Sequence, residues 1–408
     1  MNKELRKGLR TWIEIDKKAI AHNYQVFRNL IDKKCKLLSV VKSNAYGHNF
    51  LEFAKEQEKL GTDYFGVDSI VEGIALRKDG IKKPILVLGY TLPEMLEEAI
   101  KYDIEIAVSN FETLKEIFRL SSSQKREFRE SKMDSRLRGN DSGEIKIHIK
   151  VDTGMNRHGF LPSDKEKLLK ELKEITPKND KNHLGARNVS VVGLFTHFAS
   201  AKNPVFPQYT KKQIAIFQSW IDVFDKAGYK LIKHAGATSG AMLFPEAQFD
   251  MVRIGIGLYG IWTSKEAESF MNKKIELKPV LSWKTLIGEI KELPKGSKIG
   301  YDSTETLEKN SKIAICPIGY WHGYPRILSG IGRVLVNGKK VKILGRICMD
   351  IIMIDISDVK NAKVGDEVIL IGKSGKEKIT ADDVSNLADC SSYELLTRIN
   401  PLIKRIYI

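Results

Sequence analysis

Cysteine is scarce in this sequence, with four residues among 408, far apart and never in a C-x-x-C pair. That spacing excludes a disulfide-rich scaffold, argues against a thiolate metal site and fits a reducing compartment. No stretch of about 18 apolar residues occurs, so we expect no membrane span. The charged start, MNKELRKGLRTWIEID, lacks the apolar segment of a secretory signal. These absences predict a cytoplasmic protein.

Glycine and proline are also sparse, at 31 and 12 residues, which excludes collagen-like and low-complexity chains. The chain is 42% hydrophobic and 29% charged, and its length suggests two folded domains. Its 67 basic and 51 acidic residues give a net charge of +16. The basic residues run along the whole chain, mixed with acids, so we expect no nucleic-acid partner.

Short apolar runs alternate with longer amphipathic stretches in the first two thirds of the chain. The runs are LLSVV (37–41), YFGV (64–67), ILVL (85–88), IEIAV (104–108), IKIHIKV (145–151), SVVGLF (190–195), KLIKH (230–234) and RIGIGLY (253–259). Continuous apolar strands separated by helices are typical of a parallel α/β sheet. Eight such strands predict a (β/α)₈ barrel of the TIM type. An open doubly wound sheet would carry G-x-G-x-x-G after its first strand, and that motif is missing there.

The pattern changes after about residue 270, where the apolar segments become short and alternating. GRVLVNGKKVKILGR contains Asn337-Gly338, a strong signal for a hairpin turn. We therefore predict a barrel domain over residues 1–270 and a β-rich domain over residues 271–408.

Two stretches interrupt the barrel pattern. Residues 121–144 contain many charges and few large apolar side chains, so they cannot bury enough surface to fold into the core. We interpret them as a surface insertion with no role in the chemistry. Residues 176–188 are expected to form a second, smaller loop.

In a barrel of this kind, the active site lies at the C-terminal ends of the strands. That rule selects Lys42, Asp152, Thr196, His197 and His234, whereas Arg253 begins its predicted strand. A partly desolvated Lys42 would suit Schiff-base chemistry with an aldehyde cofactor. A strand-end lysine in solvent fits the same position, and both histidines fit an ordinary core. A metal site made of Asp152, His197 and His234 also stays open on chemistry alone.

The segment VVKSNAYGH (40–48) resembles the pyridoxal-phosphate (PLP) attachment motif of the alanine racemase family. Further segments resemble that family in the same order: KVDTGMNRHGF (150–160), THFASA (196–201), HAGATSGAMLFP (234–245), MVRIGIGLYG (251–260), GYD (300–302), PIGYWHGYPR (317–326) and GRICMD (345–350). Together they span both predicted domains. The resemblance implies a (β/α)₈ barrel with a C-terminal β domain, PLP as cofactor, and a homodimer with shared active sites.

The resemblance also implies the catalytic pair. Lys42 would hold PLP covalently and act as the base for the D-enantiomer. Tyr301, in IGYD, would be the base for the L-enantiomer and would reach the site from the partner subunit. Two bases on opposite faces of one Cα let one remove a proton while the other donates one. The implied function is interconversion of L- and D-alanine, which supplies D-alanine for peptidoglycan.

Binding roles follow from the same resemblance. Arg253 would contact the pyridine nitrogen, and His197 would lie beside the ring. The phosphate would be held by Tyr46, Thr238 or Ser239, and the backbone N–H groups of Gly255 and Ile256. Arg157, Tyr320 and the Met349 backbone would serve the substrate, and no metal is expected. Lys150 matches a position that is carbamylated in some members, and an ordinary strand lysine fits it equally well.

Two positions depart from the family pattern. His322 replaces an acidic residue in the G-Y-A-D-G pattern around Tyr320, and Pro401 stands where some members have a phosphate-contacting tyrosine. Alternatives to an alanine racemase are a racemase of serine or several small amino acids, and a non-catalytic PLP-binding barrel. A PLP-dependent decarboxylase and a metal-dependent barrel hydrolase are further alternatives. The hydrolase leaves Lys42, Arg253 and Tyr301 unexplained.

Overall fold

The computed structural model describes residues 6–122, 143–175 and 189–408. Most of the insertion expected near residues 121–144, and the whole of the loop expected over residues 176–188, lie outside them. Contacts divide the chain into two compact units that interleave along the sequence. The barrel unit contains Ala21–Lys42 and Leu51–Lys278, and the β-rich unit contains Met1–Ile20, Ser43–Phe50 and Pro279–Ile408.

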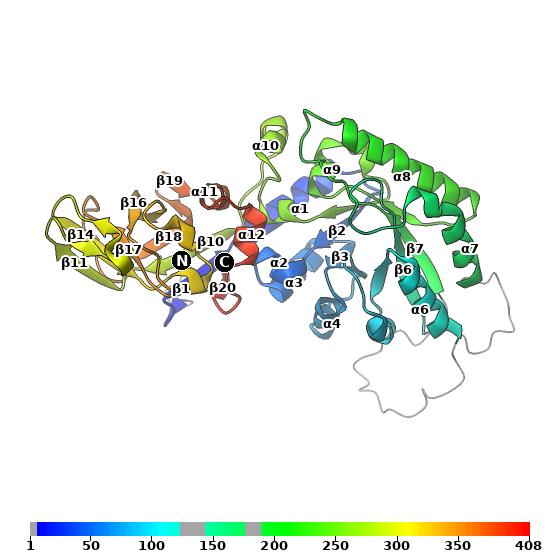
Figure 1. The fold of residues 1–408 in the computed structure, drawn as a ribbon, viewed down its shortest axis with the longest axis horizontal. Helices are drawn as coiled ribbons and strands as arrows, with labels where there is room; N and C mark the ends of the chain where they lie inside the picture. Colours follow the sequence, from blue (N-terminus) through cyan, green and yellow to red (C-terminus); the bar gives the residue numbers. More distant parts are fainter. Residues whose placement is uncertain (1–5, 123–142, 176–188) are drawn as a thin grey trace, which may run out of the picture. The chain divides into compact units, whose positions relative to one another are not determined.

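The barrel unit is built on eight parallel strands, which confirms the predicted fold class. They are β2 (Lys36–Val40), β3 (Tyr64–Val67), β4 (Ile85–Val87), β5 (Glu105–Val108), β6 (Ile145–Lys150), β7 (Val189–Phe195), β8 (Ile232–His234) and β9 (Met251–Ile254), in the order β8-β7-β6-β5-β4-β3-β2-β9. The helices are α1 (Lys17–Leu30, most of it in this unit), α3 (Phe50–Leu60), α4 (Ile70–Lys78), α5 (Leu96–Lys101), α6 (Phe111–Ser122), α7 (Lys165–Ile175), α8 (Gln208–Lys226), α9 (Thr238–Leu243) and α10 (Lys265–Met271). Figure 1 shows helices such as α4, α7 and α8 outside the strands.

The ring of strands closes between β8 and β9 through an irregular junction. Arg253 N–H donates to the Gly236 carbonyl at 2.9 Å, and Ala237 pairs with Arg253 as an isolated bridge. The expected strand over residues 253–259 is wrong in its bounds, because β9 ends at Ile254 and a 3₁₀ turn follows over Ile256–Tyr259. Gly255 breaks the strand with φ −107° and ψ −103°. Arg253 therefore lies inside its strand, near the C-terminal end, and not at its entry.

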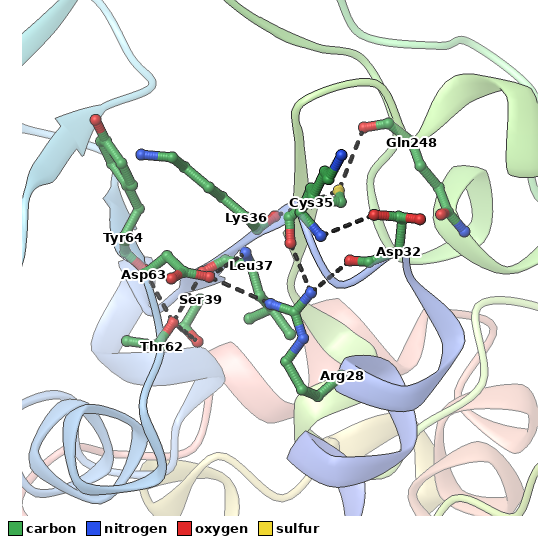
Figure 2. A network of polar contacts seen from close by, with 11 residues as sticks. Arg28, Asp32, Cys35, Lys36, Leu37, Ser39, Thr62, Asp63, Tyr64 and Gln248 are labelled. Atoms are coloured by element: carbon green, nitrogen blue, oxygen red, sulfur yellow. Dashed lines mark hydrogen bonds and ion pairs between the residues drawn. The ribbon is translucent and has the colours of Figure 1, made fainter.

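The N-terminal ends of β2 and β3 are tied together by a polar network around Arg28 of α1 (Figure 2). Its guanidinium donates to the carbonyls of Cys35 at 2.6 Å and Asp32 at 2.8 Å, and pairs with Asp63 at 3.3 Å. The Asp63 carboxylate in turn accepts the Leu37 N–H at 2.8 Å. This face of a barrel serves stability, since the active site lies at the opposite ends of the strands.

The β-rich unit confirms the predicted character of the C-terminal half. Its main sheet has the order β11-β14-β17-β16-β15-β18-β10-β1-β20, with β19 paired to β18. The strands are β1 (Thr11–Ile15), β10 (Leu281–Leu286), β11 (Glu289–Leu293), β14 (Ser311–Cys316), β15 (Arg333–Val336), β16 (Lys339–Leu344), β17 (Ile352–Asp355), β18 (Glu367–Ser374), β19 (Glu377–Ile379) and β20 (Lys404–Tyr407), and β12 (Lys298–Ile299) pairs with β13 (Glu305–Thr306). Its helical segments are α2 (Lys42–Tyr46, at the junction of the units), α11 (Ala381–Leu387) and α12 (Ser392–Thr397).

Local signals explain several of these elements. Asn337 and Gly338 form the hairpin turn between β15 and β16, both with positive φ, at 46° and 79°. Thr380 begins α11 with a capping box, in which its hydroxyl accepts the Asp383 N–H and the Asp383 carboxylate accepts the Thr380 N–H. Across the residues that the structure describes, no helix has the length and apolar content to cross a membrane.

Candidate active site

Lys42 lies two residues beyond the C-terminal end of β2, at the rim that the barrel rule selects. Its Nζ pairs with Oδ1 of Asp68 at 2.7 Å, and the two side chains are 36% and 54% exposed. Asp68 directly follows β3, so the strand-end rule applied to that strand would have found it. An ion pair this exposed is weak, about 0–1 kcal/mol, and can be broken when the amine reacts.

A buried chain of side chains runs from Glu105 to Arg253 inside the barrel. Glu105 Oε2 lies 2.7 Å from His148 Nε2, and His148 Nδ1 lies 3.0 Å from His234 Nε2. At the far end, Arg253 Nη1 lies 2.8 Å from His234 Nδ1. Because arginine only donates, His234 Nδ1 accepts and its Nε2–H donates to His148, whose own Nε2–H donates to Glu105.

Electrostatics agree with this assignment of protons. Burial, followed by the charge of Arg253, holds the pKa of His234 well below its ordinary value, so the ring is neutral. Burial lowers the pKa of Arg253 to about 9. Arg253 also donates to the carbonyls of Thr196 at 2.7 Å and Ala235 at 2.9 Å. The guanidinium is therefore held rigidly, as an electrostatic catalytic group requires.

His197 and Lys150 share the same electropositive rim. His197 Nδ1 lies 3.3 Å from Arg253 Nη2, and burial, reinforced by that charge, lowers the pKa of His197 to about 3. Burial also lowers the pKa of Lys150 to about 8, and the charges of Arg157, Arg253 and Lys42 act in the same direction. These groups lie beside a narrow gap lined by Lys150, Val151, Asp152, Met155, Arg157, His158, Thr196 and His197.

Asp152 organises the loop after β6 rather than offering a free carboxylate. Its oxygens accept the N–H groups of Gly154, Met155 and Arg157 at 2.7, 2.9 and 3.1 Å. Both nitrogens of His234 are also engaged. Within the described part of the chain, no cluster of three His, Cys, Asp or Glu side chains could hold a metal ion. These contacts give the hydrolase hypothesis no support.

Gln213 of α8 joins the two loops that carry Asp152 and His197. Its Nε2 donates to Thr153 Oγ1 at 3.2 Å, and its Oε1 accepts the Ala199 N–H at 3.0 Å. This role could not be predicted from the sequence, because the glutamine lies within an ordinary amphipathic helix.

Four of the residues expected to hold a phosphate lie around the start of α9 and the end of β9: Thr238, Ser239, Gly255 and Ile256. Thr238 Oγ1 accepts the N–H of Gly255 at 3.1 Å, which leaves its own hydroxyl hydrogen to donate. Ser239 instead donates its hydroxyl to Thr263 at 2.7 Å. A Cβ on Gly257 would lie 2.3 Å from the Phe27 ring, so the turn is tight and open only to glycine. Hydroxyl and backbone donors beside cationic side chains fit the phosphate of PLP, and the Lys42 amine fits its aldehyde.

Ser43, Asn44, Ala45 and Tyr46 form a left-handed turn directly after Lys42, with φ between 49° and 56°. Left-handed conformation costs roughly 1–2 kcal/mol for each non-glycine residue, so this turn stores several kcal/mol of strain. The predicted phosphate ligand Tyr46 is the last residue of the turn, and its ring centroid lies 5.9 Å from that of Tyr393.

The β-rich unit exposes the site residues predicted in its half. Tyr301 is 68% exposed and Met349 is 55% exposed, and Tyr320 and Trp321 are exposed as well. Backbone bonds from Tyr320 N–H to the Cys348 carbonyl and from Trp321 N–H to the Met349 carbonyl join their loops. Tyr320, Trp321 and Met349 therefore expose their side chains from two loops that are bonded to each other.

His322, the departure from the family pattern, has a structural contact. Its Nδ1 accepts the Gly319 N–H at 3.1 Å, and the Asp350 carboxylate lies 3.9 Å away. Burial lowers the pKa of His322. The neutral ring therefore caps the short turn Tyr320–His322.

Comparison with known proteins adds to this geometry. Residues 15–262 match the family model "Alanine racemase, N-terminal domain", and residues 280–407 match "Alanine racemase, C-terminal domain". A relative from Halothermothrix orenii, named alanine racemase, is 38% identical over 100% of this chain and 98% of its own. Another of that name, from Methanococcus maripaludis, is 36% identical over 97% and 98%.

Solved structures show the same similarity over nearly the whole chain. The alanine racemase of Bacillus anthracis with bound L-Ala-P has a TM-score of 0.86 and 31% identity, covering 98% of this chain and 95% of that one. The alanine racemase of Clostridium difficile 630 has a TM-score of 0.85 and 34% identity, covering 98% and 96%.

Proposed function

This chain belongs to the alanine racemase family, and from that premise we propose that it racemises alanine by a two-base mechanism with Lys42 and Tyr301. It is a PLP-dependent enzyme, as the family is. The observation that carries the proposal lies at the rim of the barrel. There the charges of the Lys42 amine and the buried Arg253 guanidinium both lower the pKa of Lys150, so the two cations lie in one site.

Lys42 would bind the cofactor's aldehyde carbon after its ion pair with Asp68 breaks. When bound, PLP withdraws electrons from the substrate's Cα and so makes its hydrogen acidic. Arg253 would face the pyridine nitrogen. A cation held there by His234 disfavours a second positive charge on that nitrogen, which limits side reactions of the carbanion.

Proton transfer would occur at both faces of the Cα. The Lys42 amine, released from the cofactor by substrate, would remove or return the proton of the D-enantiomer. The Tyr301 phenol would do the same for the L-enantiomer. Arg157 and the Met349 N–H would hold the substrate carboxylate, with Tyr320 at the same site.

The phosphate would be held by Thr238, Tyr46 and backbone N–H groups at Gly255 and Ile256, with Ser239 next to them. The Thr238 hydroxyl hydrogen is the donor best supported, because its oxygen already accepts an N–H. Ser239 donates to Thr263 and would have to rotate to take part. His197 would lie beside the pyridine ring.

A homodimer would complete each site. The exposed side chains of Tyr301, Tyr320, Trp321 and Met349 support a second copy of this chain as the partner. Tyr301 would then act in the partner's active site. An active species that sediments as a strict monomer would contradict this part of the proposal.

Lys150 is a candidate for carbamylation. A buried amine with a pKa near 8 is partly neutral at physiological pH, and only a neutral amine adds to CO₂. The carbamate would replace one of several neighbouring positive charges by a negative one, facing Arg157.

We propose alanine as the substrate, and a cytoplasmic supply of D-alanine for peptidoglycan as the role. All four cysteines are free thiols, which supports a reducing compartment. A racemase of serine remains the alternative, because one hydroxyl changes specificity by only about 1–3 kcal/mol. Comparison of kcat/KM for L-alanine and L-serine decides between them, and rescue of a depleted strain by D-alanine tests the role.

The loss of optical activity of L-alanine, followed by circular dichroism, tests the proposed reaction. PLP-loaded protein should bring the signal to zero, and Lys42→Ala should not. A persistent signal with PLP bound through the lysine would show another activity. The absence of a visible band from lysine-bound cofactor would refute the PLP chemistry.

A further inference from the structure

Residues 47–49, which directly follow the left-handed turn, are bound by residues from the far end of the sequence. Arg405 of β20 donates from Nε to the Gly47 carbonyl at 3.0 Å. Two residues later, the Tyr407 hydroxyl donates to the carbonyls of His48 at 2.8 Å and Asn49 at 3.2 Å. All of these residues belong to the β-rich unit.

Arg405 binds both the residue that follows the turn and the C-terminal loop. Its Nη1 donates to the carbonyls of Asn400 at 2.7 Å and Ile403 at 2.6 Å, and its Nη2 donates to the Ile399 carbonyl at 3.3 Å. The residue is 7% exposed, and burial lowers its pKa to about 10, so it is charged at neutral pH. Each of these four hydrogen bonds ends on a carbonyl oxygen, which fixes the guanidinium in one orientation.

The backbone packs closely where these bonds are made. A Cβ on Gly47, whose φ is 85°, would lie 2.2 Å from the Leu396 carbonyl oxygen, so α12 presses directly on the turn. Within the turn, His48 N–H donates to the Ala45 carbonyl and Phe50 N–H donates to Asn44 Oδ1, each at 3.0 Å. A strained backbone turn persists only when several surrounding contacts hold it in place, and these contacts provide that support.

We propose that Arg405 and Tyr407 are positioning residues for the reaction: they hold the left-handed turn and thereby fix Lys42, which precedes it, and Tyr46, which ends it. The proposal rests on the proposed function for the roles of Lys42 and Tyr46. Neither positioning residue needs to touch substrate or cofactor. Their effect passes through the backbone of residues 43–47 to the covalent attachment point.

Arg405→Met and Tyr407→Phe test this, with Arg28→Met as the matched control. Arg28 is also an arginine bonded to two carbonyls, but it lies at the opposite end of β2 from Lys42. For each variant we would measure amide hydrogen exchange over residues 43–50 in cofactor-free protein. On holoenzyme we would measure PLP dissociation from the visible band, and kcat and KM.

Arg405→Met should speed exchange over residues 43–50 at least tenfold and weaken PLP binding at least tenfold, which is about 1.4 kcal/mol. Tyr407→Phe should speed exchange over residues 43–50 and weaken PLP binding by about threefold each. Arg28→Met should lower overall stability and leave both readouts within about twofold of wild type. We also expect Arg405→Met to lower kcat more than it raises KM, because Lys42 itself is displaced.

Equal changes in Arg405→Met and Arg28→Met, or unchanged exchange over residues 43–50, would overturn the proposal. If Arg405→Met does not fold, Tyr407→Phe decides in the same way, since it removes one hydroxyl only. Wild-type protein that does not racemise alanine would refute the proposed function. The exchange contrast needs no cofactor and would still decide whether Arg405 holds the turn.

Discussion

Replacing Lys150 by methionine should stabilise the cofactor-free protein at neutral pH. Lys150 is 6% exposed, and burial together with three neighbouring cations lowers the pKa of its amine from 10.5 to about 8. That shift of about 2.5 pH units corresponds to about 3 kcal/mol of destabilisation at pH 7. Methionine keeps most of the volume and removes the buried charge.

The sign of the pH dependence follows from proton binding. Below pH 8 the lysine is protonated in both the folded and unfolded states, so the folded state carries the whole cost. Between pH 8 and 10.5 the unfolded state binds more protons, and wild-type stability rises with pH relative to Lys150→Met. The difference between the two proteins should fall from about 3 kcal/mol at pH 7 to about 1 kcal/mol at pH 10.

Urea unfolding of cofactor-free protein at fixed concentration in CO₂-free buffer measures this difference. Lys146→Met is the control, since Lys146 lies on the same strand and pairs with Asp103 at 2.8 Å. That substitution should not stabilise the protein. A Lys150→Met protein no more stable than wild type, or a difference independent of pH, would refute the reasoning.

The same unfolding experiment, repeated with bicarbonate, tests whether Lys150 is carbamylated. At pH 7.5, about a quarter of an amine with a pKa of 8 is neutral, against about 0.1% at a pKa of 10.5. Bicarbonate should therefore stabilise wild type and narrow its difference from Lys150→Met. Intact-protein mass spectrometry under native conditions should show the added mass in wild type alone. An unchanged difference would contradict carbamylation while leaving the charge argument intact.

Three further substitutions test other contacts. Asp68→Asn breaks only an exposed ion pair, so it should change the free energy of unfolding by less than about 1 kcal/mol and speed PLP loading by no more than about fivefold. Stopped-flow absorbance measures the loading rate, and a loss of loading would contradict the prediction. Gly193→Ala would place a Cβ 2.0 Å from His148 Nδ1, so it should destabilise the protein by more than about 2 kcal/mol and lower kcat. Thermal unfolding measures the stability and steady-state kinetics measure kcat. Wild-type values of both would contradict the buried chain of histidines. Thr380→Ala removes the cap of α11, so it should lower the free energy of unfolding in urea by about 1 kcal/mol and leave kcat/KM unchanged. An altered kcat/KM would contradict a purely structural role for Thr380.

The barrel strands could be predicted because parallel strands buried on both faces are continuous apolar runs, as in LLSVV and YFGV. The hairpin at Asn337-Gly338 could also be predicted, because this residue pair favours the turn type found there. The end of β9 was not, because RIGIGLY is apolar throughout and only the backbone at Gly255 ends the strand. The pairing of β1 with β10 and β20 depends on contacts across most of the chain, which TWIEI alone does not encode.

Parts of the site were hidden for related reasons. Glu105 and His148 occupy positions inside strands that the apolar pattern covers, and only the closed barrel brings them to His234. Within KSNAY only Asn44 favours positive φ, and a single asparagine does not predict four consecutive left-handed residues. The bonds from Arg405 and Tyr407 that we propose to hold the turn come from the far end of the chain and cannot be predicted from the local sequence.

Subunit mixing tests the central claim most directly. Lys42→Ala and Tyr301→Phe proteins, each inactive alone, would be mixed, dissociated and reassembled, and racemisation of L-alanine would be followed by circular dichroism. If each site combines Lys42 of one subunit with Tyr301 of its partner, half of the dimers are hybrids with one complete site of two. Reassembled protein should therefore recover about one quarter of wild-type activity. No recovery of activity, or substantial activity of Tyr301→Phe alone in both directions, would contradict it.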